Sequence, residues 1–395
     1  MNDIIFNRGR GGLGRSLLGK DHISGLVIEM ANENIPAPIL AEGLYKEIFS
    51  VQDAEDLLIE YSENTDNLEL DTLKYHIDNI FEVNQKAVVH LCIADTTNSG
   101  TLADSLKKMQ YKAKGEVRQS LLVSPSKDFA VGDLAPLQAA CDVLESEHMP
   151  VSVVYSPNFF GVSLGDVDLR GQDNKNVSVI ASQDGNGTGN RLFEAYSKTF
   201  SAGGTLIGVL SSAKVHENVG WVGKFNVNKN STNEYDVIKF ADGRLFEDVS
   251  RSETDTLGDK RYIFLRKHIG LAGSYFNDSH TAISESSDYA YIENNRTIDK
   301  AVRQCREFLL PSLNSPLYVN ENGTLSEDTI ASFKNDTDNA LEDMQRRGEV
   351  SSFQTLIDPE QDVLSTSKLA ITIKIVPVGV ARNIVVNIGF AVNLS

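Results

Sequence analysis

The stretch IVVNIGFAVNL, residues 384–394, contains the clearest structural pattern in this sequence. Hydrophobic side chains recur at every second position along its whole length, which is the period of a β-strand. The residues on this apolar side are Ile384, Val386, Ile388, Phe390, Val392 and Leu394. Such a strand needs a partner, because its apolar side must be covered and its backbone groups must be hydrogen-bonded. The partner is expected to be a sheet of the same chain or a sheet of a neighbouring copy.

The chain upstream of this stretch alternates between candidate strands and amphipathic helices from residue 25 onward. Apolar runs indicate strands at residues 26–30, 87–94, 121–124, 151–155 and 176–182. The region 222–276 is expected to be mainly β structure, with strands at residues 236–240, 244–249 and 262–266. This order predicts an α/β (α+β) body with mixed β-sheets flanked by helices, together with extended N- and C-terminal arms.

Two long helices and a short strand precede the C-terminal stretch. The first helix is expected over residues 299–311. The second is expected to begin near Ser326 and to stop at Gly348, which are the residue types that favour a helix start and a helix end. Alternating apolar residues then predict a strand at 371–375.

The composition is that of a folded, acidic protein. With 41% hydrophobic and 23% charged residues among 395, the chain has enough apolar side chains for a sizeable core. The formal net charge of -18 argues against nucleic acid as a partner, because phosphate binding needs a basic surface. No apolar run is long enough to cross a bilayer and the first residues lack the pattern of a secretory signal, so no membrane insertion is expected.

Positive charge is concentrated at the two ends of the sequence. Residues 1–20 carry four basic residues and one acidic residue, and residues 368–395 carry three basic residues and no acidic one. Basic ends on an acidic body favour contacts between copies, because every copy carries both partners. The candidates for such intersubunit contacts are Arg8, Arg10, Arg15, Lys374 and Arg382.

Four short motifs match known sites, and each lacks part of its signature. The glycines of residues 9–14 fit a dinucleotide-binding pattern without the helix that should follow, and Asp21 stands where an overlapping P-loop needs a hydroxyl. Ser163 has the flanking glycines of a hydrolase nucleophile but an extended pattern after it. Residues 184–189 resemble the start of a calcium loop, with Ala195 in place of its final Glu. We expect residues 9–14 to belong to a flexible basic arm and the P-loop match to be due to chance. We expect Ser163 to lie in a loop between sheet elements and residues 184–189 to form a tight turn.

No catalytic or metal-binding constellation is evident in the sequence. The three cysteines are widely spaced and form no CxxC pair, and the seven histidines show no HExxH spacing. The chain is therefore expected not to be an enzyme and to hold no cofactor or metal. Its unusual features lie at its termini, which points to assembly. If the terminal strand adds to the sheet of a neighbour, the contact is strand addition.

Several segments in the second half of the chain follow one another in a recognisable order. A Gly/Asp loop after a strand (177–189) is followed by AKVHENVGW (213–221), KRYIF (260–264) running to GSYFND (273–278), and Asn295-Arg296 before the helix at 299–311. Three further elements, the second helix, a short β segment and the terminal strand, complete the series. In this order the chain resembles bacteriophage-type contractile tail-sheath proteins, with residues 1–150 similar only in general layout.

The resemblance implies a structural subunit of a contractile tail sheath. Such subunits polymerise as stacked hexameric rings around an inner tube and contract to drive the tube through a target envelope. Their N- and C-terminal arms add strands to a sheet in adjacent subunits. By this resemblance, residues 384–394 would be the C-terminal exchange strand, and Ile4, Ile5 and Phe6 the N-terminal one. The expected divisions are an N-terminal arm at 1–24, an N-terminal α/β portion of the body at 25–155, a central and C-terminal α/β core at 156–380, and the exchange strand at 381–395.

The same resemblance implies partners and a location. The partners would be further copies of the chain, an inner tail-tube protein, and baseplate and tail-terminator proteins. The location would be a virion tail or a phage-tail-like particle assembled in the bacterial cytoplasm. The acidic side of the helix that begins near Ser326 would face either the inner tube or solvent. The alternatives are a non-contractile virion or ring structural protein, and a serine hydrolase using Ser163.

Overall fold

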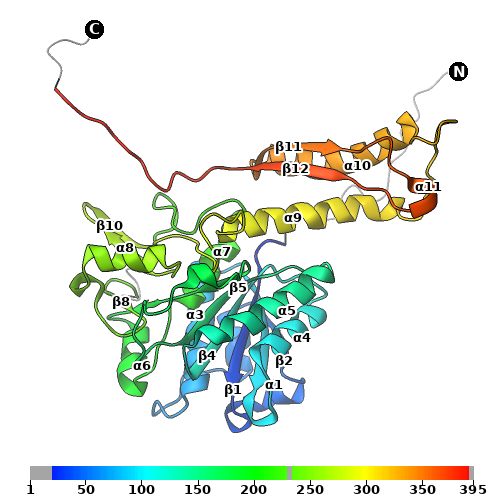
Figure 1. Ribbon diagram of the computed structural model, residues 1–395. Helices are drawn as coiled ribbons and strands as arrows, with labels where there is room; N and C mark the ends of the chain where they lie inside the picture. The colour runs from blue at the N-terminus through cyan, green and yellow to red at the C-terminus, as the bar shows by residue number, and fades with distance from the viewer. Residues whose placement is uncertain (1–19, 229–233, 391–395) are drawn as a thin grey trace, which may run out of the picture. The chain divides into compact units, whose positions relative to one another are not determined.

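The computed structural model describes residues 20–228 and 234–390. The chain divides into a larger unit, Met1–Arg306, and a smaller unit, Glu307–Ser395 (Figure 1). Together these units contain a mixed sheet flanked by helices, which confirms the predicted α/β class.

A six-stranded sheet forms the centre of the larger unit, in the order β2-β3-β1-β4-β5-β6. Its strands are β1 (Ile23–Met30), β2 (Tyr45–Ile48), β3 (Val88–Asp95), β4 (Gln119–Asp128), β5 (Ser152–Asn158) and β6 (Val177–Val179). All neighbouring pairs are parallel except β2 and β3, which are antiparallel. The expected boundary between two portions of the body, at residues 155 and 156, falls inside β5. The central sheet therefore continues across this boundary.

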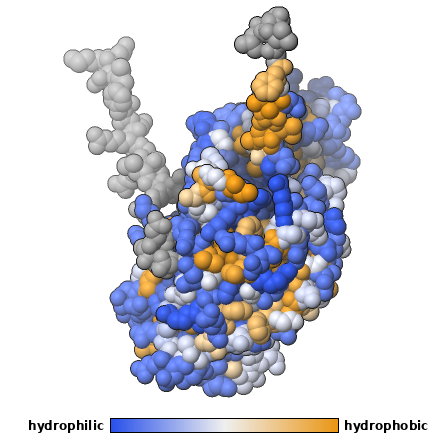
Figure 2. All heavy atoms as spheres, turned by 90° about the vertical axis from the view of Figure 1, so that its left-hand side faces the viewer, coloured by the Kyte–Doolittle hydropathy of each residue, from blue (hydrophilic) through white to orange (hydrophobic). Residues whose placement is uncertain are grey.

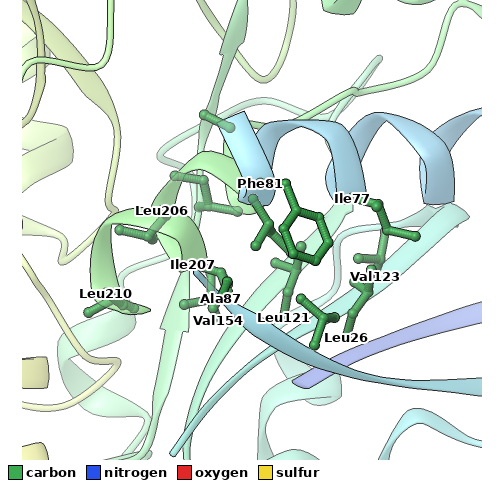
Figure 3. Packing of buried hydrophobic residues seen from close by; sticks show 14 of the residues in the cluster. Leu26, Ile77, Phe81, Ala87, Leu121, Val123, Val154, Leu206, Ile207 and Leu210 are labelled. Atoms are coloured by element: carbon green, nitrogen blue, oxygen red, sulfur yellow. The ribbon is translucent and has the colours of Figure 1, made fainter. Parts of the chain in front are cut away.

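Helices cover both faces of this sheet. On one face, α3 (Leu68–Val83) and α7 (Gly203–Ser212) pack against the strands, and α2 (Val51–Asp56) packs on α3. On the other face lie α4 (Leu102–Lys112) and α5 (Leu134–Ser146). Figure 3 shows side chains of α3, α7 and the strands meeting in the first of two large hydrophobic clusters. Because both faces are covered, the middle of each central strand is a continuous apolar run, such as Leu26–Ile28 in β1 and Leu121–Val123 in β4, as the sequence predicted. Buried polar side chains such as Gln119 and Ser152 lie at the strand ends.

The helix α7 lies close to α3 because glycines face the contact. A Cβ atom at Gly204 would lie 2.6 Å from the backbone oxygen of His76, and one at Gly208 would lie 2.6 Å from Cβ of Val83. Every residue from Gly203 to Ser211 is buried, so the segment has no polar side. This explains why hydrophobic periodicity did not identify it as a helix.

The region from residue 222 to residue 276 contains less β structure than predicted. The strand β8 (Ile238–Phe240) pairs with β7 (Ser182–Asp184), and β9 (Leu265–His268) forms a hairpin with β10 (Leu271–Phe276). The strand predicted at 244–249 is wrong. This segment contains a short 3-10 helix at Phe246–Asp248 and leads to α8 (Arg251–Asp259).

The remaining helices of the larger unit are short apart from α9. They are α1 (Ala37–Ala41), α6 (Thr188–Tyr196) and α9 (Ile292–Leu309), the last of which ends in the smaller unit. The helix α9 begins seven residues before its predicted start at 299.

The smaller unit is built from one long helix and two strands. The helix α10 (Glu327–Arg346) begins after Ser326, whose Oγ accepts a hydrogen bond from the backbone N–H of Thr329 at 3.3 Å. Gly348 follows its end with φ of 71°, a conformation that favours glycine. Both predicted ends of this helix are confirmed. The strands β11 (Val350–Leu356) and β12 (Thr372–Pro377) flank α11 (Val363–Thr366).

Candidate assembly surfaces

The strands β11 and β12 form an antiparallel ribbon with one covered face. Phe353 lies opposite Ile375, and Gln354 lies opposite Lys374. The helix α10 packs against β11, while Leu356 and Val376 are 40% and 54% exposed. Within the described residues no third strand joins this ribbon, so both of its outer edges are open to another strand.

The C-terminal extension, residues 378–390, follows β12 and contains the described part of the predicted exchange strand. It carries no helix or strand, and every residue from 381 to 390 is exposed. Ile384 is 80% exposed, Ile388 is 95% exposed and Phe390 is fully exposed. Figure 2 shows this run of hydrophobic residues leading to the grey C-terminal end. These apolar side chains are therefore left uncovered by the described chain.

The structure describes only part of the predicted set of intersubunit residues. Within it, Val386 is 75% exposed, Lys374 is exposed on β12, and Arg382 is exposed in the extension. The other predicted residues lie outside the described part of the chain: Ile4, Ile5, Phe6, Arg8, Arg10, Arg15, Val392 and Leu394.

A buried charge cluster, which we did not predict, holds the first described residues against α9. The carboxylate of Asp21 lies 2.6 Å from Nζ of Lys300, and a guanidinium nitrogen of Arg296 lies 3.3 Å from the backbone oxygen of Ala213. Burial alone would raise the pKa of Asp21, but Lys300 lowers it below its ordinary value.

Two more residues of α9 complete the charge cluster. Burial raises the pKa of Asp299 to about 6, against the opposing effect of nearby Arg303. The spacing of Arg296, Lys300 and Arg303 places three cations on one side of a helix, and this pattern in the sequence could have revealed the cluster. The first described residues are therefore held against α9, the helix that ends in the smaller unit, by these charged side chains.

The sequence motifs for chemistry do not come together as sites. Ser163 is exposed in a turn, and no histidine of the described chain is hydrogen-bonded to its side chain. The carboxylate of Asp184 accepts hydrogen bonds from the backbone N–H groups of Gly187 at 2.6 Å and Asn190 at 3.0 Å. This carboxylate caps the start of α6, in agreement with the tight turn expected at residues 184–189.

The described residues contain neither a metal-like cluster nor a membrane-spanning helix. No group of three or more His, Cys, Asp or Glu side chains in the described residues is arranged to hold a metal ion. Among the helices that the structure describes, none combines the length and the apolar composition needed to cross a bilayer.

Two family models match nearly all of the sequence. The model for the N-terminal domain of DUF2586 matches residues 1–280, and the model for its C-terminal domain matches residues 288–395. This chain belongs to the DUF2586 family. No curated protein matches this DUF2586 chain in sequence.

Solved structures similar to the DUF2586 chain include contractile sheath proteins. One is from the helical sheath of the anti-feeding prophage in its contracted state, with 17% identity, a TM-score of 0.62, and coverage of 93% of this chain and 92% of that chain. Another is from the contracted sheath complex of the extracellular contractile injection system PVC, with 12% identity, a TM-score of 0.62, and coverage of 99% and 98%. A third is a sheath tail protein from Desulfitobacterium hafniense, with 11% identity, a TM-score of 0.53, and coverage of 96% and 100%. The chain therefore has the fold of contractile tail-sheath proteins, and the predicted resemblance is confirmed for the fold.

Proposed function

We propose that this protein is a structural subunit of a contractile tail sheath and is not an enzyme. Copies would polymerise as stacked hexameric rings around an inner tube, and contraction would drive the tube through a target envelope. The partners would be other copies, the tube protein, and baseplate and tail-terminator proteins, in a phage-tail-like particle assembled in the bacterial cytoplasm. The observation that carries the proposal is an exposed apolar extension in a chain whose smaller unit also has two open strand edges.

In this proposal the C-terminal extension adds a strand to the β11–β12 ribbon of a neighbouring copy. The extension supplies alternating apolar side chains and the ribbon supplies an unpaired edge, which are the two parts of strand addition. Each new backbone hydrogen bond contributes about 1 kcal/mol, and each buried apolar side chain contributes about 2 kcal/mol. Ordering each residue costs about 1 to 2 kcal/mol, so many such links together hold a tube while single links stay reversible.

Charge supports the same pairing. Residues 307–367 carry twelve acidic and three basic residues, whereas residues 368–395 carry three basic and no acidic residues. An extension reaching its own body and one reaching a neighbour gain similar attraction, and the proposal takes the neighbour because that choice links copies in a repeating array. The basic residues of the N-terminal arm, residues 1–24, would act in the same way.

Electron microscopy of the purified protein tests the proposal. The full chain is expected to form long hollow tubes, and deletion of residues 384–395 is expected to leave a folded, soluble monomer, because the described part of the deleted segment, residues 384–390, adds nothing to either core. The variant Ser163→Ala is the matched control and is expected to form tubes like the full chain. Tubes formed by the deletion variant would show that the proposed exchange strand is wrong, and an absence of tubes with the full chain would count against a sheath.

A further inference from the structure

A basic groove lies on the α4–α5 face of the larger unit. It is lined by Lys107, Lys108, Tyr111, Lys112 and Val143, with Asp104 at its margin. Tyr111 is 49% exposed and Val143 is 43% exposed, so apolar surface lies among the lysines. Residues 104–114 contain four lysines and one aspartate, although the whole chain has a net charge of -18. This groove is therefore a local positive region on an acidic protein.

The groove is only partly neutralised by its own neighbours. Lys107 forms an ion pair with Asp104 at 2.9 Å, and Nζ of Lys108 donates a hydrogen bond to the backbone oxygen of Gly43 at 2.9 Å. The Tyr111 hydroxyl donates to Glu147 at 2.6 Å. The groove is thus lined by three lysines and one aspartate, with Glu147 bonded to its tyrosine, and the remaining positive charge can attract an acidic partner.

An acidic lobe with the complementary character lies between β2 and α3. We define this acidic lobe as residues 47–66, which include α2 and carry seven acidic residues and no basic one. Two large apolar side chains of the lobe point outward, since Phe49 is 54% exposed and Leu58 is 58% exposed. The lobe therefore presents apolar side chains among negative charges, and the groove presents them among positive charges.

Leu58 is held outward by an unfavourable backbone conformation. It has φ of 61° at the position after α2 where glycine is usual. Its backbone N–H donates to Glu55, and the next N–H, that of Ile59, donates to Ala54, which is the hydrogen-bond pattern of a Schellman helix end. A bulky residue strains this position, and such strain is characteristic of functional sites.

The groove and the lobe lie on opposite sides of the central sheet. The helix α4 packs on β3 and β1 from one side, whereas α2 packs on α3, which covers the other side (Figure 1). A second copy placed alongside the first can therefore bring its lobe to the groove of the first, and a third copy can do the same to the second. Contact of groove with groove, or lobe with lobe, would place like charges opposite each other.

We propose that the α4–α5 groove binds the acidic lobe of a second copy of this chain, with Leu58 or Phe49 entering between Tyr111 and Val143. This contact rests on the proposed function, because it requires copies to repeat side by side. It is separate from strand addition, since it uses only residues of the larger unit. A head-to-tail contact of this kind joins subunits into closed rings or helical filaments and does not stop at a dimer.

Cross-linking between two different single-cysteine variants tests the pairing directly. The variants Tyr111→Cys and Leu58→Cys are made in separate full-length chains, in which the native Cys92, Cys141 and Cys305 are buried. Mixed assemblies treated with a short bis-maleimide are expected to give a product joining the two variants. Ile269→Cys, at a fully exposed position elsewhere, replaces Leu58→Cys as the control and is expected to give no product with Tyr111→Cys. Tyr111→Cys chains joined only to each other would overturn the proposal.

Charge reversal tests the contribution of the groove and the lobe to assembly. Lys107→Glu with Lys112→Glu is expected to raise the protein concentration needed for assembly about tenfold, because opposed charges become alike. Adding Asp56→Lys and Glu60→Lys to the same chain is expected to restore assembly. The proposed contact is wrong if the unmodified chain forms tubes and the folded fourfold variant assembles no better than the double variant. The sheath proposal would still stand in that case. If the unmodified chain forms no tubes, the sheath proposal fails first.

A change at Leu58 separates the contact from monomer stability. The variant Leu58→Gly removes the backbone strain, so the free monomer is expected to be as stable as the unmodified one or more stable. The same variant is expected to weaken assembly, because it removes an apolar side chain from the contact. Unimpaired assembly with Leu58→Gly, together with unimpaired assembly of Phe49→Ala, would contradict the proposal.

Discussion

In the larger unit, the central strands lie between two layers of helices, whereas in the smaller unit β11 and β12 form a ribbon covered on one face by α10. Leu26, in the centre of β1, is completely buried, while Ile388 in the C-terminal extension is 95% exposed. Both residues belong to stretches with strong strand patterns. The difference shows that a strand pattern can be buried inside one chain or left exposed, and in the proposed function the exposed pattern joins chains.

The largest expected effect is on the free energy of unfolding, when one apolar side chain is truncated in the larger unit and one in the C-terminal extension. Leu26→Ala is expected to lower the free energy of unfolding by about 3 kcal/mol, because it leaves a cavity in a closed core. Ile388→Ala is expected to change it by less than about 0.5 kcal/mol, because the side chain is already in water. Urea unfolding at concentrations below assembly measures both values. Equal losses would mean that the extension belongs to the core of its own subunit.

A second prediction concerns the two sides of the exchange strand. Val385 and Val386 are adjacent valines, 83% and 75% exposed, but only Val386 is on the apolar side of the pattern. Val386→Asn is expected to raise the concentration needed for assembly about thirtyfold, since burying a valine contributes about 2 kcal/mol. Val385→Asn is expected to have a smaller effect, measured by light scattering. Equal effects would show that the strand buries both sides or neither.

The smallest expected effect compares two lysine ion pairs in the larger unit. Lys300→Met removes the cation paired with the mostly buried carboxylate of Asp21, and we expect a loss of about 1 kcal/mol because Arg296, Arg303 and some solvent contact remain. Lys46→Met removes an exposed pair with Glu42 and is expected to cost less than about 0.5 kcal/mol. Thermal unfolding of both variants tests the ranking. A larger loss with Lys46→Met would mean that the cluster on α9 does not stabilise the body.

Much of the fold could be predicted from the sequence because local signals agreed with burial. The helix α10 has a capping serine, a periodic apolar side and a terminal glycine, and its ends lie where these residues predict. The segment at 244–249 has the residue types of a strand, but its middle forms the 3-10 helix Phe246–Asp248 and Ser250 then caps the start of α8. The helix α7 escaped prediction because it is buried on all sides.

The candidate surfaces could be predicted only where they are continuous in sequence. The extension is one uninterrupted pattern, so its residues can be proposed directly from the sequence. The groove combines α4 with Val143 of α5, and the charge cluster combines Asp21 with residues of α9. Such combinations depend on how distant segments pack, and a single sequence does not show that packing.

The open edges of β11 and β12 also affect how the subunit behaves before it is incorporated. Unpaired strand edges beside exposed hydrophobic residues recruit any extended polypeptide, including misfolded ones. In the proposed function, a newly synthesised subunit would therefore need to reach a sheath lattice, or a chaperone, before it encounters other nascent chains. High expression without a growing particle is expected to produce inclusion bodies, and the charged surface of the larger unit would delay this outcome without preventing it.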